Sequence, residues 1–154
     1  LTDVNISQVE KGVLIKKGNL TMTNGSITFK GGEKNYGIGV WGEGGETTAN
    51  ITGTRITGGG SGEGMGVIMG GREMTMTGVN ISQVKMGVWV GGGTVTVSGG
   101  SMTGVQTGIT MSGSGTLVVN NGARIEFTSG GTRNYGIGVG GTVNATITGV
   151  EIKG

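Results

Sequence analysis

The hexapeptide VNISQV at residues 4–9 recurs unchanged at residues 79–84. A second hexapeptide, NYGIGV at residues 35–40, recurs at residues 134–139. Self-similarity along a chain is typical of repeat architectures, in which each unit contacts only its neighbours. The repeats therefore have to be aligned before any single residue is interpreted.

Aligning the whole chain gives three short apolar segments in each repeat. The first segment is Leu20-x-Met22, with counterparts at 49–51, 74–76, 95–97, 117–119 and 145–147. The second centres on Ile6, Ile27, Ile56, Ile81, Met102, Ile125 and Ile152. The third is glycine followed by Val13-x-Ile15, with counterparts at 38–40, 67–69, 88–90, 109–111 and 137–139. Alternation at i and i+2 predicts strands, and no window carries the i, i+3, i+4 stripe of a helix.

The length of the repeat predicts how these strands are arranged. The shortest repeats, Ile6 to Ile27 and Ile81 to Met102, span 21 residues, which three short strands and three corners fill. One such circuit cannot bury its own apolar side, but circuits stacked about 4.8 Å apart can. We therefore predict an all-β, right-handed parallel β-helix with open ends, a single segment over residues 1–154 of about six to seven turns.

Two local features complete this prediction. The longer repeats add residues mainly at the corner between the second and third strands, at 31–36, 58–65 and 129–135. At the tight corners, Val9, Val84 and Val105 are expected to fill the interior. The glycines before the third strand are expected to allow a sharp turn or a positive φ.

Composition excludes several classes of function. Histidine and cysteine are absent, which removes the commonest general base, the commonest metal ligand and the best nucleophile. The only aspartate is Asp3, and the glutamates are expected singly on corners or outward on the second strand: Glu10, Glu33, Glu43, Glu46, Glu63, Glu73, Glu126 and Glu151. We therefore expect no enzyme, no metal and no cofactor. The net charge of +2 argues against a dedicated nucleic-acid binder, and no apolar run reaches membrane-spanning length.

The outward positions of the first strand form a hydroxyl ladder. They are Thr21/Thr23, Asn50/Thr52, Thr75/Thr77, Thr96/Ser98 and Thr146/Thr148. Threonine favours strands, and stacked hydroxyls can bond to one another, so this ladder is interpreted as strand support and solubility.

The outward column of the third strand has a different chemistry. It contains Leu14, Gly39, Ile68, Trp89, Thr110 and Gly138, with Trp41 just beyond. An exposed apolar strip of Leu14, Trp41, Ile68 and Trp89 indicates an interaction surface. The alternative is that a neighbouring helix or chain segment covers it.

Five lysines gather near the first repeats: Lys11, Lys16, Lys17, Lys30 and Lys34. They could attract an anionic polysaccharide or a cell surface. The alternative is a solvated, charged end of the molecule, because Glu10 and Glu33 lie among them.

The phrases LTMTNGSITF at 20–29, NYGIGV at 35–40 and MTMTGVNIS at 74–82 resemble the repeats of pertactin-like autotransporter passengers. They are most similar to those of the Bartonella autotransporters, which include the Bartonella angiogenic factor. The resemblance covers essentially the whole chain. It implies a bacterial protein exported through an outer-membrane barrel and then secreted or displayed on the cell surface.

Members of that family act as adhesins, and the angiogenic members stimulate endothelial growth-factor receptors. The resemblance therefore implies binding of a host-cell surface protein by a fragment of a longer passenger, since neither a signal peptide nor a translocator barrel is present here. The alternative is a passive stalk that spaces or templates another region. End-to-end self-association through open strand edges is a further expectation.

Overall fold

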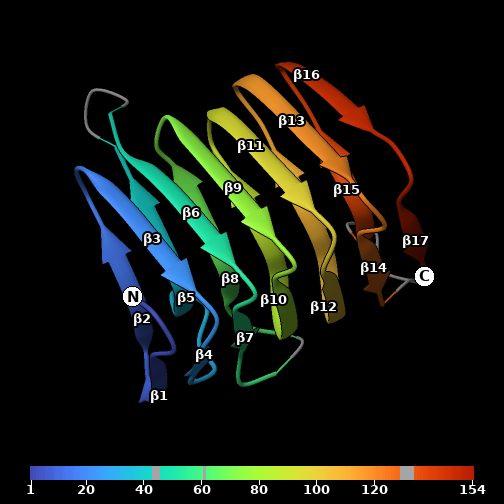
Figure 1. The fold of residues 1–154 in the computed structure, drawn as a ribbon. Helices are drawn as coiled ribbons and strands as arrows, with labels where there is room; N and C mark the ends of the chain where they lie inside the picture. Colours follow the sequence, from blue (N-terminus) through green and yellow to red (C-terminus); the bar gives the residue numbers. More distant parts are fainter. Residues whose placement is uncertain (43–45, 61, 129–133) are drawn as a thin grey trace.

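The protein is a β-solenoid in which every strand pairs in parallel with its equivalents in the neighbouring turns (Figure 1). The computed structural model describes residues 1–42, 46–60, 62–128 and 134–154. Within these ranges the chain forms seventeen strands and no helix. The prediction of a parallel β-helix is confirmed, with about six turns.

The first strands of the repeats form one wall, a six-stranded sheet in the order β16-β13-β11-β9-β6-β3. Its members are β3 (Asn19–Thr23), β6 (Thr48–Thr52), β9 (Glu73–Thr77), β11 (Gly93–Ser98), β13 (Ser114–Asn120) and β16 (Thr142–Ile147). We call this sheet the first wall.

The second and third strands belong to one 11-stranded sheet that bends around a corner. The second wall holds β1 (Asn5–Val9), β4 (Ser26–Phe29), β7 (Arg55–Thr57), β14 (Arg124–Phe127) and β17 (Glu151–Lys153). The third wall holds β2 (Lys11–Ile15), β5 (Tyr36–Trp41), β8 (Met65–Gly70) and β15 (Tyr135–Val139). Two long strands, β10 (Asn80–Val90) and β12 (Ser101–Met111), run through both walls.

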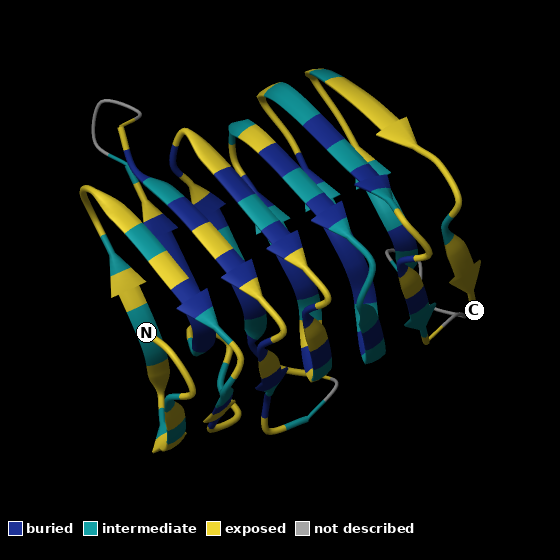
Figure 2. Ribbon diagram, in the orientation of Figure 1, coloured by how far each residue is buried: buried dark blue, intermediate teal, exposed yellow. Residues whose placement is uncertain are grey.

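The apolar segments stack in register, as the repeat predicts. Ile27 pairs with Ile6 on one side and with Ile56 on the other, and the column continues to Ile152. Side chains from all three walls meet in one continuous core, which Figure 2 shows as buried positions alternating with exposed ones along the strands. Burial of such side chains stabilises the fold by about 1.5–3 kcal/mol each.

The two long strands show how the chain crosses a corner without leaving the sheet. The alignment predicted separate second and third strands in these repeats, but β10 and β12 continue through the corner. The bend falls at Gln83 and Gly104, whose φ values of 57° and 60° lie in the left-handed region. The next residues, Val84 and Val105, are fully buried, which confirms the prediction for these two corners, whereas Val9 in the first turn is only partly buried against the core.

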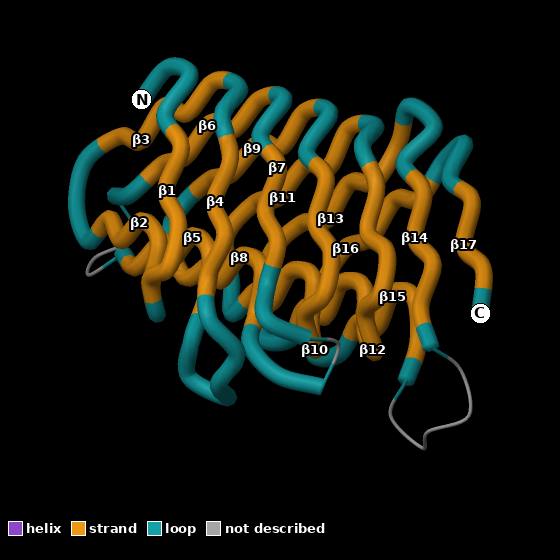
Figure 3. Tube along the Cα trace, turned by 90° about the horizontal axis from the view of Figure 1, so that it is seen from below, coloured by secondary structure: helices purple, strands orange, loops and turns teal. Residues whose placement is uncertain are grey.

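The longer corners also lie where the alignment put them. The chain leaves the sheet between Phe29 and Tyr36 and again between Thr57 and Met65. Figure 3 shows these two loops projecting side by side from one edge of the solenoid. Most of the third predicted insertion, 129–135, lies outside the described residues, as does Glu43.

The glycines before the third strands form a column, but the positive φ considered for them is not found. The column consists of Gly12, Gly37, Gly66, Gly87, Gly108 and Gly136, none of which has positive φ. A Cβ on Gly37 would lie 2.5 Å from Cγ2 of Ile56 and 2.8 Å from the carbonyl oxygen of Gly66. These positions are glycine because the second-wall side chain of the next turn occupies the space of a Cβ.

Candidate functional site on the third wall

The outward column of the third wall is assembled as the sequence predicts. Leu14 pairs with Gly39, Gly39 with Ile68 and Ile68 with Trp89. The column then continues through Thr110 to Gly138. Trp41 lies two residues beyond Gly39 on β5, so it faces the same side. The strip of Leu14, Trp41, Ile68 and Trp89 is therefore one surface that spans four neighbouring turns.

Exposure differs along this strip. Leu14 is 47% exposed and Trp41 is 38% exposed, whereas Ile68 and Trp89 are partly buried. The prediction that Ile68 and Trp89 are exposed is therefore only partly correct. The side chains of the strip shield one another because neighbouring turns are only about 4.8 Å apart.

The two indole rings border a shallow hollow. Its lining consists of Trp41, Gly42, Ile68, Gly70 and Trp89, and its volume is about 330 Å³. The lining is mostly apolar, and Gly70 leaves the space between the two rings open because it has no side chain. Trp41 and Trp89 are the only tryptophans of the chain, so both belong to this one feature.

Tyr36 is buried and packs against the residues of this surface, although the sequence did not point to it. Its ring lies 5.6 Å from the Trp41 ring, centroid to centroid, and it covers the outer side of Gly39. Nζ of Lys11 lies 6.0 Å from the centroid of the same ring, at the limit of a cation–π contact. Burial raises the pKa of Tyr36 above its ordinary value of 10.0.

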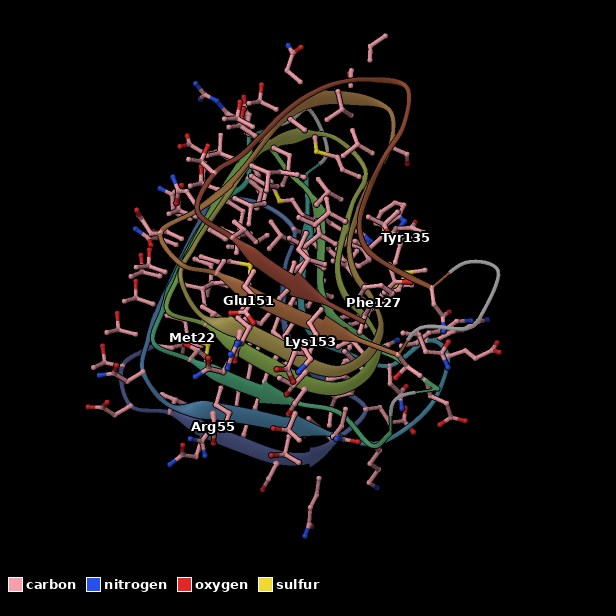
Figure 4. The ribbon with its side chains drawn as sticks, turned by 90° about the vertical axis from the view of Figure 1, so that its right-hand side faces the viewer. Met22, Arg55, Phe127, Tyr135, Glu151 and Lys153 are labelled. Carbon is pink, nitrogen blue, oxygen red and sulfur yellow. The ribbon has the colours of Figure 1, made fainter. Side chains whose placement is uncertain are left out.

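The NYGIGV echo now has a structural explanation. In both copies asparagine holds the corner loop: Nδ2 of Asn35 donates to the carbonyl oxygen of Lys30 at 3.0 Å, and Nδ2 of Asn134 donates to that of Thr128 at 2.7 Å. In both copies the tyrosine ring then covers the second glycine of the motif. The outer position of Tyr135 is visible in Figure 4. Its hydroxyl lies 3.0 Å from Oγ1 of Thr110. The repeated hexapeptide therefore marks the end of a corner loop and the start of a third-wall strand.

The lysines of the predicted basic patch divide into two groups. Lys11 begins β2, and Lys16 follows Ile15 at the position that Trp41 occupies in the next turn, so these two border the strip. Lys17 lies beyond the strand end, whereas Lys30 and Lys34 lie on the corner loop after β4. Lys85 on β10, which lies outside the predicted basic patch, precedes Met86 of the third wall. All six lysines are exposed.

Ion pairs do not neutralise these lysines. Over the described ranges, the ion pairs within 4.0 Å involve only Arg124, with Glu126 at 4.0 Å and Glu151 at 3.5 Å. None of β2, β5, β8, β10, β12 and β15 contains an aspartate or a glutamate. The strands of the third wall therefore carry lysines and no acidic residue, although Glu10 precedes Lys11 and the carbonyl oxygen of Glu63 accepts a hydrogen bond from the amide of Lys85 at 3.1 Å.

The first wall carries the predicted hydroxyl ladder in register, from Thr21 through Asn50 and Thr75 to Thr96. Val118 interrupts it on β13. Within the described part of the chain, no ladder threonine bonds to the ladder threonine of the next turn. Hydrogen bonds between turns occur instead at the strand ends, for example from Nδ2 of Asn121 to Oγ of Ser98 at 2.6 Å. The ladder supports the strands by propensity and packing.

Acidic side chains do not gather into a site in the described residues, where no group of three or more acidic residues could hold a metal ion. The same residues contain no helix long and apolar enough to span a membrane. We compared the chain with known proteins, and no family model, curated protein or solved structure matches it.

Proposed function

We propose that this chain is a rigid scaffold that recognises a partner on a host-cell surface through its third wall. The observation that carries the proposal is the strip itself. Leu14, Trp41, Ile68 and Trp89 lie on one face in four successive turns, and Trp41 remains 38% exposed beside an apolar hollow. Tryptophan is the residue most enriched in binding hot spots.

The biological setting of the proposal rests on the resemblance of the repeats. We infer a pertactin-like autotransporter passenger that is secreted or displayed on the bacterial surface and acts as an adhesin or a growth-factor-receptor agonist. The proposal involves no catalysis and no cofactor. The solenoid supports this role because its continuous register holds outward side chains at fixed spacings.

The second candidate is a passive stalk. It is favoured by the unbroken stacking of the core column from Ile6 to Ile152, which makes the chain a stiff spacer whatever its surface carries. A stalk needs no partner of its own. It predicts that the chain shows no saturable binding to host cells.

Binding of the labelled chain to endothelial cells separates these candidates. We expect saturable binding that Trp89→Ala weakens at least tenfold, because truncation of a hot-spot tryptophan costs about 2 kcal/mol or more. Thr96→Ala is the matched control, since Thr96 faces outward on β11, the first-wall strand that follows β10. Absence of saturable binding supports the stalk. Equal affinities of the wild type and of Trp89→Ala would exclude the strip as the binding surface.

A further inference from the structure

The partner of the third wall can be narrowed further, an inference that rests on the proposed function. We propose that the third wall binds a linear acidic polysaccharide, whose sugar rings stack on Trp41 and Trp89 and whose carboxylate or sulfate groups pair with Lys11, Lys16 and Lys85. Three properties of the surface lead to this class of ligand. They are the size of the hollow, the width of the apolar strip and the sign of the charges around it.

The hollow between the indole rings suits a group the size of one ring. Its volume of about 330 Å³ lies at the lower end of the range for small-molecule pockets. A helix of about 10–12 Å diameter needs a longer and deeper groove. The faces of indole rings carry negative charge density, which attracts polarised C–H groups such as those on the flat sides of a pyranose ring.

The apolar strip is too narrow for a stable protein interface by itself. Such an interface buries about 800 Å² on each partner, roughly a ninth of the 7246 Å² surface of this chain. The apolar side chains of the strip lie in two adjacent outward columns: Leu14, Ile68 and Trp89 share the first with Gly39 and Thr110, and Trp41 pairs with Gly70 in the second. A thin, chain-like ligand that follows these columns matches this shape.

The lysines of the third wall lie apart from one another, so a ligand that pairs with all of them needs negative groups at separated points. Lys11 and Lys16 belong to the first turn, and Lys85 lies three strands along the solenoid axis, about 14 Å away at the spacing of paired strands. Several linked sugar rings span this length, whereas one does not. Single-stranded nucleic acid also combines stacking with negative charge, but it requires a denser track of cations than three lysines in a chain of net charge +2.

The test uses a sulfated octasaccharide as the probe and the intact chain as the binder. Because both tryptophans line the hollow, their intrinsic fluorescence reports binding directly. We expect saturable quenching of the wild type by the octasaccharide. The variant Trp41→Ala/Trp89→Ala has no tryptophan, so its binding is compared with that of the wild type by titration calorimetry, and we expect it to be at least tenfold weaker. A neutral glucan of equal length is expected to bind at least tenfold more weakly than the sulfated probe.

Two triple variants of equal charge test the role of the wall lysines. We expect Lys11→Gln/Lys16→Gln/Lys85→Gln to weaken binding at least tenfold and to reduce its dependence on salt. The matched control, Lys30→Gln/Lys34→Gln/Lys153→Gln, lowers the net charge equally away from the wall and is expected to change affinity less than twofold. Equal losses in both variants overturn the inference, as does equally tight binding of an oligonucleotide of the same charge.

Failure of this inference can be distinguished from failure of the proposed function. Enzymatic removal of acidic glycans from endothelial cells is expected to abolish the Trp89-dependent binding. If that binding persists and the octasaccharide does not quench the tryptophans, the partner is a protein, and the inference falls while the proposed function stands. If neither untreated cells nor the octasaccharide binds saturably, both fall.

Discussion

The first and third walls share one scaffold but differ in what they present to solvent. Both are parallel sheets whose inward positions feed the same core. The first wall presents threonine and asparagine, whereas the third presents Leu14 and Trp41, with Ile68 and Trp89 partly exposed and glycines between them. The solenoid therefore fixes where the outward columns lie, and only the outward residue types decide whether a wall is a coat or a surface for recognition.

The walls also differ on their inner sides. Both walls point large side chains inward, such as Met22 from the first and Met69 from the third, but only the third-wall strands have an entry glycine that touches the second wall of the next turn. We expect Gly87→Ala to lower the free energy of unfolding by about 1–3 kcal/mol, because its Cβ would lie 2.6 Å from both Sδ of Met102 and the carbonyl oxygen of Gly108.

Urea denaturation measures this effect, and Gly140→Ala provides the control. Nothing lies within 4 Å of a Cβ at Gly140, and its φ is not positive, so a change within about 0.5 kcal/mol is expected there. Equal effects at both positions would show that close contact between walls does not explain the glycine column.

The two tyrosines of the third wall form a matched pair for a smaller effect. Tyr135→Phe removes the hydrogen bond to Oγ1 of Thr110 and is expected to cost about 0.5–1.5 kcal/mol of unfolding free energy. Tyr36→Phe is expected to change stability less at pH 7, because Tyr36 acts through its ring contacts with Trp41 and Gly39. Denaturation midpoints that rank the two variants in the opposite order would contradict the contacts described for these rings.

Tyr36 also gives the third wall a sensitivity to alkaline pH. Its pKa is raised above 10.0 in the folded state by burial, so the neutral phenol is favoured in the folded protein. Stability is unaffected below pH 10 and falls as pH rises through the raised pKa, because the unfolded state then releases its proton first. Thermal unfolding between pH 9 and 11 should show a steeper loss for the wild type than for Tyr36→Phe. Parallel curves would argue against burial of the phenol.

The smallest effect is expected on the first wall. Thr96→Val retains the β-branched shape and removes a hydroxyl that bonds to no ladder threonine of the neighbouring turns, so the change in stability should stay within about 0.5 kcal/mol. Thermal melting is sufficient to detect a larger loss. A loss above 1 kcal/mol would mean that ladder hydroxyls do bond between turns.

The sequence predicted the fold because the same residue types recur at the same places in each turn. The column from Ile6 to Ile152, the buried corner valines and the outward strip all follow from alignment and alternation. Alternation could not predict that Tyr36 folds back over Gly39, since that depends on how a side chain packs three residues along the same strand. The recurrence of NYGIGV, which places a tyrosine before the same glycine in two turns, was the sequence signal that could have pointed to Tyr36.

The positive φ considered for the glycine column was wrong for a related reason. A glycine that tolerates positive φ and a glycine that makes room for a neighbour look identical in sequence. Only the structure distinguishes these two kinds of glycine, because it shows that a Cβ on Gly37 would lie 2.5 Å from Cγ2 of Ile56 in the following turn. The exposed fractions of Ile68 and Trp89 could not be predicted from the sequence either, because they depend on how side chains of adjacent turns shield one another.

The difference between the walls is tested most directly by making the third wall resemble the first. Leu14, Trp41, Ile68 and Trp89 are replaced together by threonine, and saturable binding to endothelial cells is compared with that of the wild type. Circular dichroism first establishes that the variant is folded. We predict that binding falls at least tenfold, because the apolar strip becomes a second threonine coat. Unchanged affinity of the folded variant would contradict a recognition role for the third wall.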